Sequence, residues 1–272
     1  MTPSEADRAF AGSIPQLYAQ FMVPLIFAPY AEDICRRVVA RRPAHVLEIA
    51  AGTGVVTRQL TAALPSTTAI VATDLNQLML DQAIAQGTSR PVTWQQADAM
   101  QLPFADGAFD VVVCQFGAMF FPDKAKAYAQ ARRVLRPGGA FIFNVWGRIE
   151  ENDFANVIGQ ALARAYPADP PLFMARVPHG YFDTGTIAQD LRDGGFEKTP
   201  DFAIVTARSR AESARIPAFA YCQGTPWRGE IEARHAPSLD EATGLAEAAL
   251  VARFGDGAVD GQIRAHVVTI EK

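Results

Sequence analysis

The sequence has few residues of the kinds that build disulfide frameworks or metal centres. Its 272 residues include only three cysteines, which lie far apart with no C-x-x-C spacing: Cys35, Cys114 and Cys222. A sparse, odd set of this kind argues against a disulfide framework and indicates free, buried thiols. The four histidines are grouped neither with one another nor with a cysteine, so we predict no metal site.

The sequence also lacks a surplus of positive charge and a long apolar run. Its formal net charge is −4 and its lysines and arginines are scattered, which leaves no electrostatic footprint for nucleic acid or an anionic membrane. The most apolar early stretch, Phe21 to Ala31, contains two prolines and is shorter than the ~20 residues that span a bilayer. The N-terminus is acidic where a signal peptide is basic. We therefore expect a cytoplasmic protein with no nucleic-acid or membrane partner.

What the chain does contain is an alternating pattern with enough apolar material for a large core. Hydrophobic residues make up 49% of it, as in folded globular proteins. Between residues 45 and 147, short β-rich runs alternate with helical ones, which is typical of βαβ units and a parallel sheet. The expected strands are His45–Ala50, Ala69–Thr73, Val92–Gln96, Phe109–Cys114 and Ala140–Trp146. The expected helices are Val55–Leu64, Leu75–Gln86 and Lys124–Leu135, the last of which ends at the turn Arg136-Pro137-Gly138-Gly139.

After residue 147 the alternation is interrupted twice, over residues 148–181 and 211–255. Interruptions this long are more often substrate caps than idle loops. The later helix of the second one is capped by Ser238 or Asp240. The helices expected in this half are Asp153–Ala165, Thr186–Asp193, 211–222 and 239–253, and the strands are Phe202–Arg208 and Gln262–Ile270.

These segments predict one domain over residues 1–272. Residues 1–44 form an N-terminal helical cover, residues 45–147 form a cofactor-binding core, and residues 148–181 and 211–255 form cap insertions.

The strongest local motif runs from Val46 to Gly54, out of a buried strand and into a helix. Gly52 and Gly54 let the backbone turn sharply and let a ligand approach it closely. Dinucleotide folds use the same device, but Thr57 stands where they need a third small residue. Glu48 would repel a pyrophosphate, whereas it suits a cationic amino group such as that of S-adenosylmethionine.

Two acidic residues follow the next two expected strands. Asp74 lies about 20 residues after the glycines, where it is placed to accept both ribose hydroxyls. It also suits the N-cap of the following helix, and the two roles are compatible. Asp98 can accept a hydrogen bond from an adenine amine while the N–H of Ala99 donates to a ring nitrogen. A plain turn is the alternative for this segment.

Taken together, these motifs resemble those of the class I S-adenosylmethionine-dependent methyltransferases. The resemblance is closest to the broad type 11 group that includes the ubiquinone and menaquinone C-methyltransferases, and it covers about residues 45–147. It rests on four blocks: Glu48-x-x-x-Gly52-x-Gly54 with Asp74, Asp98-Ala99-x-x-Leu102-Pro103-Phe104, Phe109-Asp110-Val111-Val112, and Arg133-Val134-Leu135-x-Pro137-Gly138-Gly139.

The resemblance implies a doubly wound, Rossmann-like α/β fold. Its sheet has seven mostly parallel strands with an antiparallel last strand, and helical cap insertions stand outside it. It implies S-adenosylmethionine as the cofactor, with the ribose on Asp74 and the adenine on Asp98 and Ala99. The remaining cofactor residues that it implies are Glu48, Gly52, Gly54 and Gln115 at the methionine end, Leu75 or Met79 on the adenine face, and the neighbouring Ala50 and Met100.

Tyr18 and Phe21 precede the core and supply aromatic faces, which attract a sulfonium as they attract an ammonium. They are predicted either to cover the cofactor or to be ordinary helix core.

The reaction that this implies is methyl transfer to a small, largely hydrophobic acceptor. Alignment contributes ~7–11 kcal/mol of the barrier, so no nucleophile on the enzyme is needed. A hydroxyl or a phenolic carbon as acceptor would gain from a general base. The weak candidates for such a base, each more often a packing residue, are His179, Tyr181, Tyr221 and His235.

Two other functions stay open at this point. One is an NAD(P)-dependent oxidoreductase on a related fold, and the other is a non-catalytic S-adenosylmethionine-binding protein. The sequence also leaves the oligomeric state open, a homodimer included.

Overall fold

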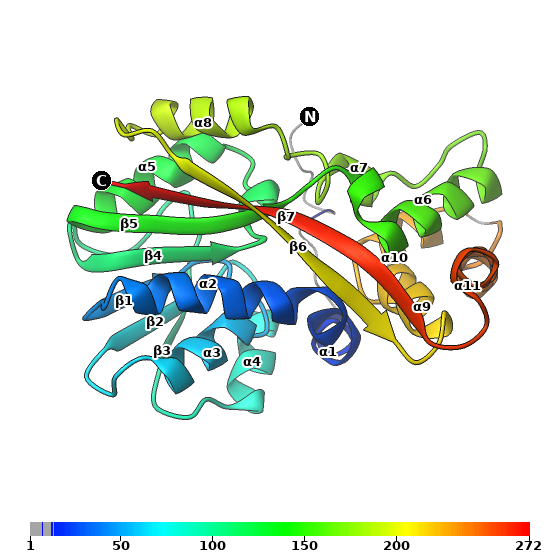
Figure 1. Cartoon of the computed structure of the whole chain (residues 1–272), viewed down its shortest axis with the longest axis horizontal. Coiled ribbons are helices and arrows are strands. Elements are labelled where there is room, and N and C mark those ends of the chain that lie inside the picture. The colour runs from blue at the N-terminus through cyan, green and yellow to red at the C-terminus, as the bar shows by residue number, and fades with distance from the viewer. Residues whose placement is uncertain (1–6, 8–11, 13, 235) are drawn as a thin grey trace.

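A single sheet organises the molecule. The computed structural model describes residues 7, 12, 14–234 and 236–272, and within them seven strands pair in the order β3-β2-β1-β4-β5-β7-β6 (Figure 1). The strands are β1 (His45–Glu48), β2 (Ala69–Asp74), β3 (Thr93–Gln96), β4 (Phe109–Gln115), β5 (Leu135–Trp146), β6 (Asp201–Ala211) and β7 (Val259–Glu271). The pairs among β1 to β5 are parallel, and β7 lies antiparallel between β5 and β6. The predicted fold is therefore confirmed.

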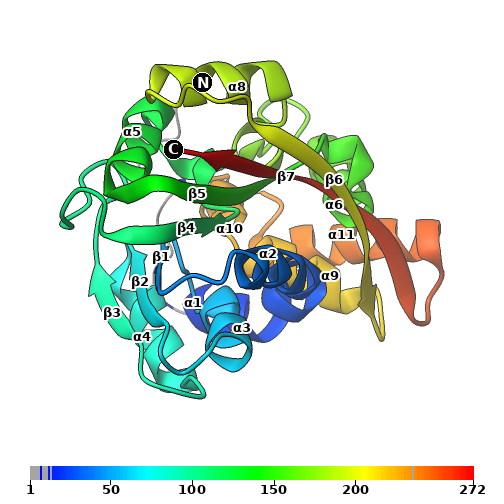
Figure 2. The ribbon, with the colours of Figure 1, turned by 60° about the vertical axis from the view of Figure 1, so that its left-hand side comes forward.

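Apolar side chains cover both faces of the central strands. In β4, Val111 and Val113 pack into a core with helices α2 (Ala28–Ala40) and α3 (Val55–Ala63), whereas Val112 packs into the core on the opposite face. Successive residues of a strand point to opposite faces, so a continuous apolar run suits a strand that is buried on both sides. Viewed from the side in Figure 2, the sheet lies between α5 (Lys124–Val134) and α8 (Thr184–Asp193) above and α2 and α3 below.

The helices around the sheet follow the predicted alternation closely. Those of the first half are α1 (Ile14–Leu17), α2 (Ala28–Ala40), α3 (Val55–Ala63), α4 (Gln77–Gln86) and α5 (Lys124–Val134). Those of the second half are α6 (Asp153–Ala165), α7 (Phe173–Arg176), α8 (Thr184–Asp193), α9 (Arg215–Gln223), α10 (Trp227–Glu232) and α11 (Leu239–Phe254). A π-helix, Tyr18–Phe27, joins α1 to α2 and contains Pro24. Proline has no N–H to donate, and such wide turns often mark functional positions.

Two local expectations were wrong. The strand predicted from Ala140 begins at Leu135, because the register shifts between the pairs Phe109↔Leu135 and Val111↔Ala140. The turn at Gly138, whose φ is 77°, is therefore an irregularity inside β5 and not a loop before it. The short helix α10 was not predicted at all.

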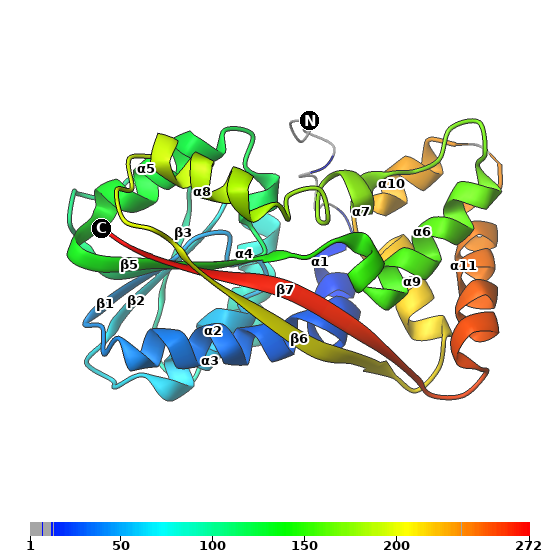
Figure 3. The same ribbon diagram turned by 45° about the horizontal axis from the view of Figure 1, so that its top comes forward.

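Both interruptions of the sheet pattern build a helical cap. Helices α6 and α7 come from residues 148–181, and α9, α10 and α11 come from residues 211–255. Figures 1 and 3 show these five helices together, beyond the carboxyl ends of β4 and β5, with β6 and β7 extending toward them. Two segments far apart in the sequence thus meet on the side of the sheet where ligands bind in open α/β folds.

The N-cap residue of helix α11 provides a test of this local structure. Ser238 is its N-cap, and the Ser238 N–H and hydroxyl both donate to Glu241 Oε2 at 2.8 Å. We expect Ser238→Ala to lower the free energy of unfolding by about 1 kcal/mol, because it removes the side-chain cap. Urea denaturation measures this loss. Asp240→Ala is the control, since it removes a charge in the same turn and one exposed, long hydrogen bond from Gln223 (3.4 Å) but not the N-cap, and it should cost less; equal losses would contradict the assignment.

Candidate functional site

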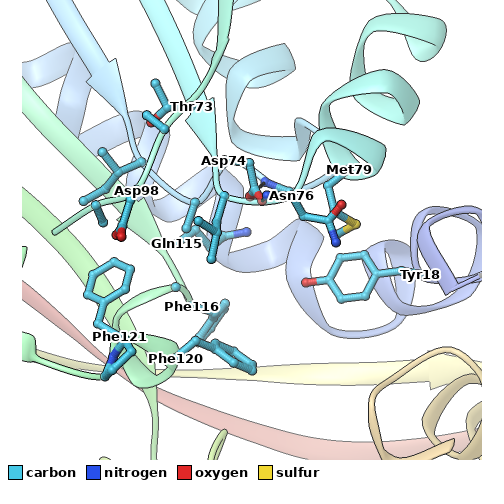
Figure 4. Close-up of a pocket in the computed structure, with 18 residues that line it drawn as sticks. Tyr18, Thr73, Asp74, Asn76, Met79, Asp98, Gln115, Phe116, Phe120 and Phe121 are labelled. Carbon is cyan, nitrogen blue, oxygen red and sulfur yellow. Dashed lines mark hydrogen bonds between the residues drawn. The ribbon is translucent and has the colours of Figure 1, made fainter. Parts of the chain in front are cut away.

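A cavity opens where the parallel strands β1 to β4 end. It comprises about 820 Å³ of empty space, its open mouth included. Figure 4 shows side chains around it that come from the segment Tyr18–Phe27, from the ends of β2 and β4 with the residues that follow them, and from the segment after β3. Nine of the predicted cofactor residues line it: Tyr18, Ala50, Gly52, Asp74, Leu75, Met79, Asp98, Ala99 and Gln115.

The loop after β1 forms one wall of this cavity. Its backbone has positive φ at Ala50 (54°) and Gly52 (56°). A Cβ on Gly52 would lie 3.6 Å from Met79 Cε, which is an ordinary contact, so the empty cavity has room for it. A Cβ on Gly117 would lie 2.4 Å from the Cβ of Ala50, so the loop after β4 needs glycine to pack there. Sequence reasoning missed Gly117, which no motif marks.

Asp74 joins this loop to the end of β2. Its Oδ2 accepts a hydrogen bond from the N–H of Gly52 and its Oδ1 accepts one from the N–H of Asn76, both at 2.8 Å. The N-cap of α4 is Asn76, whose Oδ1 accepts from the N–H of Leu78 at 2.9 Å. The prediction that Asp74 caps this helix was therefore wrong. Burial raises the pKa of Asp74, while its backbone donors act in the opposite direction.

Glu48 and Gly54 lie behind the loop and do not line the cavity. Glu48 is buried, and its Oε2 accepts a hydrogen bond from the hydroxyl of Thr57 at 2.6 Å. Burial raises the pKa of Glu48 to about 8, although Thr57 and Arg58 act to lower it. A Cβ on Gly54 would lie 3.0 Å from the Trp94 ring, so this glycine serves close packing between the loop and β3.

The segment after β3 is a turn that presents Asp98 and Ala99 to the cavity. Asp98 Oδ1 accepts a hydrogen bond from the N–H of Met100 at 2.8 Å. Met100 itself does not line the cavity. Arg133 on α5 holds the rest of this loop, donating to the carbonyl oxygens of Leu102 at 2.8 Å and Phe104 at 2.6 Å. The turn predicted for Asp98 is thus present, and Asp98 also lines the cavity.

A second cavity adjoins the first and shares three of its lining residues: Tyr18, Phe116 and Phe120. It encloses about 410 Å³, its mouth included. Both cap segments contribute to it, through Phe173 and Met174 of the first and Thr225 of the second. Its other lining residues come from the π-helix, the loop after β4, β5 and the cap: Met22, Ile26, Phe27, Met119, Trp146, Pro178 and Pro226.

Two aromatic residues of the second cap segment, Phe219 and Trp227, line neither of these cavities. Trp227 is buried and its Nε1 donates to the carbonyl oxygen of Pro171 at 3.0 Å. Phe219 meets Phe21 edge to face, with ring centroids 5.4 Å apart. Neither ring lines a cavity, and Phe21 is helix core. Both segments therefore contribute to the second cavity, through residues that the sequence analysis did not single out.

Three of the four candidate bases, His179, Tyr181 and Tyr221, line neither cavity. Burial lowers the pKa of His179 to about 4, and its Nδ1 lies 2.9 Å from the carbonyl oxygen of Gly147. The hydroxyl of Tyr181 donates to Asp190 at 2.6 Å, and burial raises the pKa of Tyr181. Burial likewise raises the pKa of Tyr221. His235 lies outside the described residues. Among the residues that the structure does describe, no three His, Cys, Asp or Glu side chains gather as metal ligands would.

Comparisons with known proteins agree with this geometry. A family model described as a methyltransferase domain matches residues 47–143. The ubiquinone/menaquinone biosynthesis C-methyltransferase of Stutzerimonas stutzeri is 37% identical over 133 residues, which are 47% of this chain and 49% of that protein. The chain thus spans about half the length of the curated relatives that it matches.

Solved structures share the fold at low identity. Phosphoethanolamine N-methyltransferase 2 of Haemonchus contortus, in complex with S-adenosylhomocysteine, is 16% identical with a TM-score of 0.60, covering 97% of this chain and 59% of its own. The YcgJ protein of Bacillus subtilis is 17% identical with a TM-score of 0.55, covering 89% of this chain and 98% of its own.

The buried carboxyl of Glu48 predicts a pH-dependent stability. Its pKa in the folded chain, about 8, lies above the ordinary 4.5, so the folded state binds more protons than the unfolded state between these values. Its contribution to stability is therefore fully present below about pH 4.5 and is lost as pH rises toward 8. Glu48→Gln keeps an acceptor for Thr57 but does not titrate. Urea midpoints from pH 5 to 8 should show the variant gaining stability relative to the wild type as pH rises, and parallel curves would refute this.

Proposed function

We propose that this chain, which belongs to the class I S-adenosylmethionine-dependent methyltransferases, transfers the methyl group of S-adenosylmethionine to a small apolar molecule. The observation that carries the proposal is the pair of cavities with a common wall. One is lined by acidic residues at the ends of β2 and β3, as a polar cofactor requires, and the other is almost wholly apolar. A methyl group at the shared wall would face the acceptor directly.

The first cavity suits each part of the cofactor. Asp74 stands at the end of β2, where a carboxylate receives ribose hydroxyls. Asp98 and the N–H of Ala99 would hold the adenine edge, with Leu75 and Met79 against its face. The methionine end would lie along the Ala50–Gly52 loop.

Gln115 supports this orientation of the cofactor. Its Oε1 is buried, lines the first cavity and makes no hydrogen bond within the described residues. Buried acceptors of this kind are nearly always satisfied, so the atom calls for a ligand donor. The amino group of the methionine part is such a donor.

Glu48 acts on the cofactor site indirectly, through the loop after β1. It stands behind the loop and hydrogen-bonds to Thr57, so we assign it to shaping the loop. A cationic ligand beside the loop would lower its pKa, because a nearby positive charge favours the carboxylate.

The protein's part in the reaction is alignment and exclusion of water. The sulfonium methyl is already activated, and bringing it into line with an acceptor supplies much of the rate. Tyr18 and Phe27 stack with ring centroids 5.0 Å apart, which sets the Tyr18 ring at the shared wall beside Phe116 and Phe120. Aromatic faces there would stabilise the sulfonium.

A small acceptor suits the second cavity better than a macromolecule does. The helical cap covers this end of the sheet, and no open basic groove accompanies it among the cavity-lining residues. The acceptor named for the Stutzerimonas relative does not transfer to this chain, because the family match ends at residue 143, before the cap segments.

We also propose a cytoplasmic location. The three cysteines are free and buried, which suits a reducing compartment. In the described part of the chain, no helix combines the length and apolarity needed to cross a bilayer.

A matched pair of glycine variants tests the cofactor cradle. Gly52 (φ 56°) and Gly87 (φ 74°) both have positive φ, so alanine strains the backbone at both positions, and more so at Gly87, whose ψ is 170°. Only Gly52 lines the cavity, and nothing lies within 4 Å of a Cβ on Gly87. We expect Gly52→Ala to lose affinity for S-adenosylhomocysteine in calorimetric titration, while Gly87→Ala binds as the wild type does. Equal affinities in the two variants would remove the loop from the site.

Asp74→Ala tests the ribose contact. We expect a loss of ~1.5–3 kcal/mol in S-adenosylhomocysteine binding, as for other hydrogen bonds to a charged group. Asp81→Ala, on the exposed side of α4, is the control. Titration with NAD under the same conditions tests the oxidoreductase alternative. Normal S-adenosylhomocysteine affinity in Asp74→Ala, or tight NAD binding by the wild type, would contradict the proposal.

A further inference from the structure

We infer that the acceptor is a planar, acidic hydroxyl compound, such as a phenol or enol, that is methylated on oxygen as its own anion. The inference rests on the proposed function and specifies its acceptor. Its basis is the make-up of the second cavity, which has aromatic walls and, among the described residues that line it, no side chain able to take a proton.

The aromatic walls favour a planar ring. Phe116 and Trp146 stack face to face with ring centroids 3.8 Å apart and planes 8° from parallel, and both rings line the second cavity. Phe27 lies beside them, its centroid 5.5 Å from that of Phe116 and 6.0 Å from that of Trp146. Aromatic surfaces of this size bind best to another flat apolar ring.

The polar side chains among the described residues that line this cavity are Thr225 and Tyr18, which carry hydroxyls, and Trp146, whose indole N–H can only donate. Thr225 Oγ1 donates to the carbonyl oxygen of Tyr221 at 2.7 Å and accepts from the N–H of Trp227 at 3.1 Å, so it serves the cap backbone. Burial and the charge of Asp74 raise the pKa of Tyr18. A neutral phenol of this kind donates a hydrogen bond but does not remove a proton from a substrate.

The remaining proton acceptors of the described residues lie elsewhere or are engaged. Asp74 and Asp98 line the first cavity, where their oxygens accept from backbone N–H groups. His179 is held on the carbonyl oxygen of Gly147 and does not line the second cavity. The buried thiol of Cys114 has its pKa raised to about 12 by desolvation. The acceptor must therefore lose its proton to water before the methyl group moves.

Transfer to oxygen then needs no further proton movement. The oxyanion attacks the methyl carbon, a C–O bond forms, and the S–CH₃ bond breaks with its electron pair going to sulfur. An anion and a sulfonium become a neutral ether and a neutral thioether. A cavity of low polarity favours a step that cancels charge, because opposite charges attract more strongly there than in water.

Transfer to a ring carbon would leave a proton to be removed. The attacked carbon would carry both its hydrogen and the new methyl group, and only loss of that C–H proton would restore the aromatic ring. This loss calls for a base at the cavity, which none of the lining residues supplies. The geometry therefore favours oxygen over carbon, unlike the reaction named for the Stutzerimonas relative.

The test uses phenols of one shape and different acidity: 4-nitrophenol, 4-cyanophenol, phenol and 4-methylphenol. Titration with S-adenosylhomocysteine first establishes cofactor binding, and its failure would refute the proposed function itself. Rates with S-adenosylmethionine are then measured from pH 6 to 10, and products are identified by NMR. We expect methyl ethers, with the pH of half-maximal kcat/KM moving down as the acceptor becomes more acidic.

Three outcomes would overturn the inference while cofactor binding stands. They are a ring-methylated product, one pH midpoint shared by all four acceptors, and no methylation of any of them. The shared midpoint would reveal a base on the protein.

Two variants test whether the acceptor binds in the second cavity. Met174→Trp fills the second cavity and should raise KM for 4-nitrophenol at least ~10-fold, since overpacking a well-packed site typically costs 1–3 kcal/mol. Unchanged affinity for S-adenosylhomocysteine shows that this variant folds. Tyr221→Phe, outside both cavities, should leave the pH profile unaltered. A normal KM in Met174→Trp, or a shifted profile in Tyr221→Phe, would count against the inference.

Discussion

The carboxylate of Asp74 ties together the loops on which the site depends. By accepting from the N–H groups of Gly52 and Asn76, it fixes the end of β2 against the loop after β1 and against the start of α4. Backbone N–H groups are directional donors, so one buried carboxylate sets the spacing of three chain segments at once. The first cavity exists because these segments are held apart at that distance. A ribose would then bind to an acceptor that is already oriented.

The second cavity depends on a different constraint, which is the length of strands β6 and β7. These strands run past the end of the parallel sheet, and the segments before and after β6 fold back as helices over the strand ends (Figure 3). Side chains from both segments meet Trp146 and Phe116 there. Arg176 strengthens this cover, because it pairs with Asp7 at 2.6 Å and with Glu230 at 2.7 Å, and Glu230 also accepts from the N–H of Phe173 at 2.9 Å. These bonds join the helical cap to the N-terminal segment next to the second cavity.

Sequence reasoning succeeded where local chemistry has one solution. A left-handed turn after a buried strand calls for glycine, and acids at strand ends meet at one edge of a parallel sheet, so Gly52, Asp74 and Asp98 could be placed in advance. It failed where orientation is decided by distant partners. Trp227 and Phe120 are both aromatic residues in short helical segments, yet only Phe120 faces a cavity, because the carbonyl of Pro171 draws Trp227 into the core. His179 was predicted as a weak candidate base, but its ring is buried and held on the carbonyl oxygen of Gly147.

The central claim is that the transferable methyl group stands at the wall shared by the two cavities. A crystal structure with S-adenosylhomocysteine tests it most directly. The account predicts the adenine beside Asp98 and Ala99, the ribose on Asp74, and the thioether sulfur between Tyr18 and Phe120, facing the second cavity. A sulfur that faces solvent, or a ligand whose adenine occupies the second cavity, would contradict it.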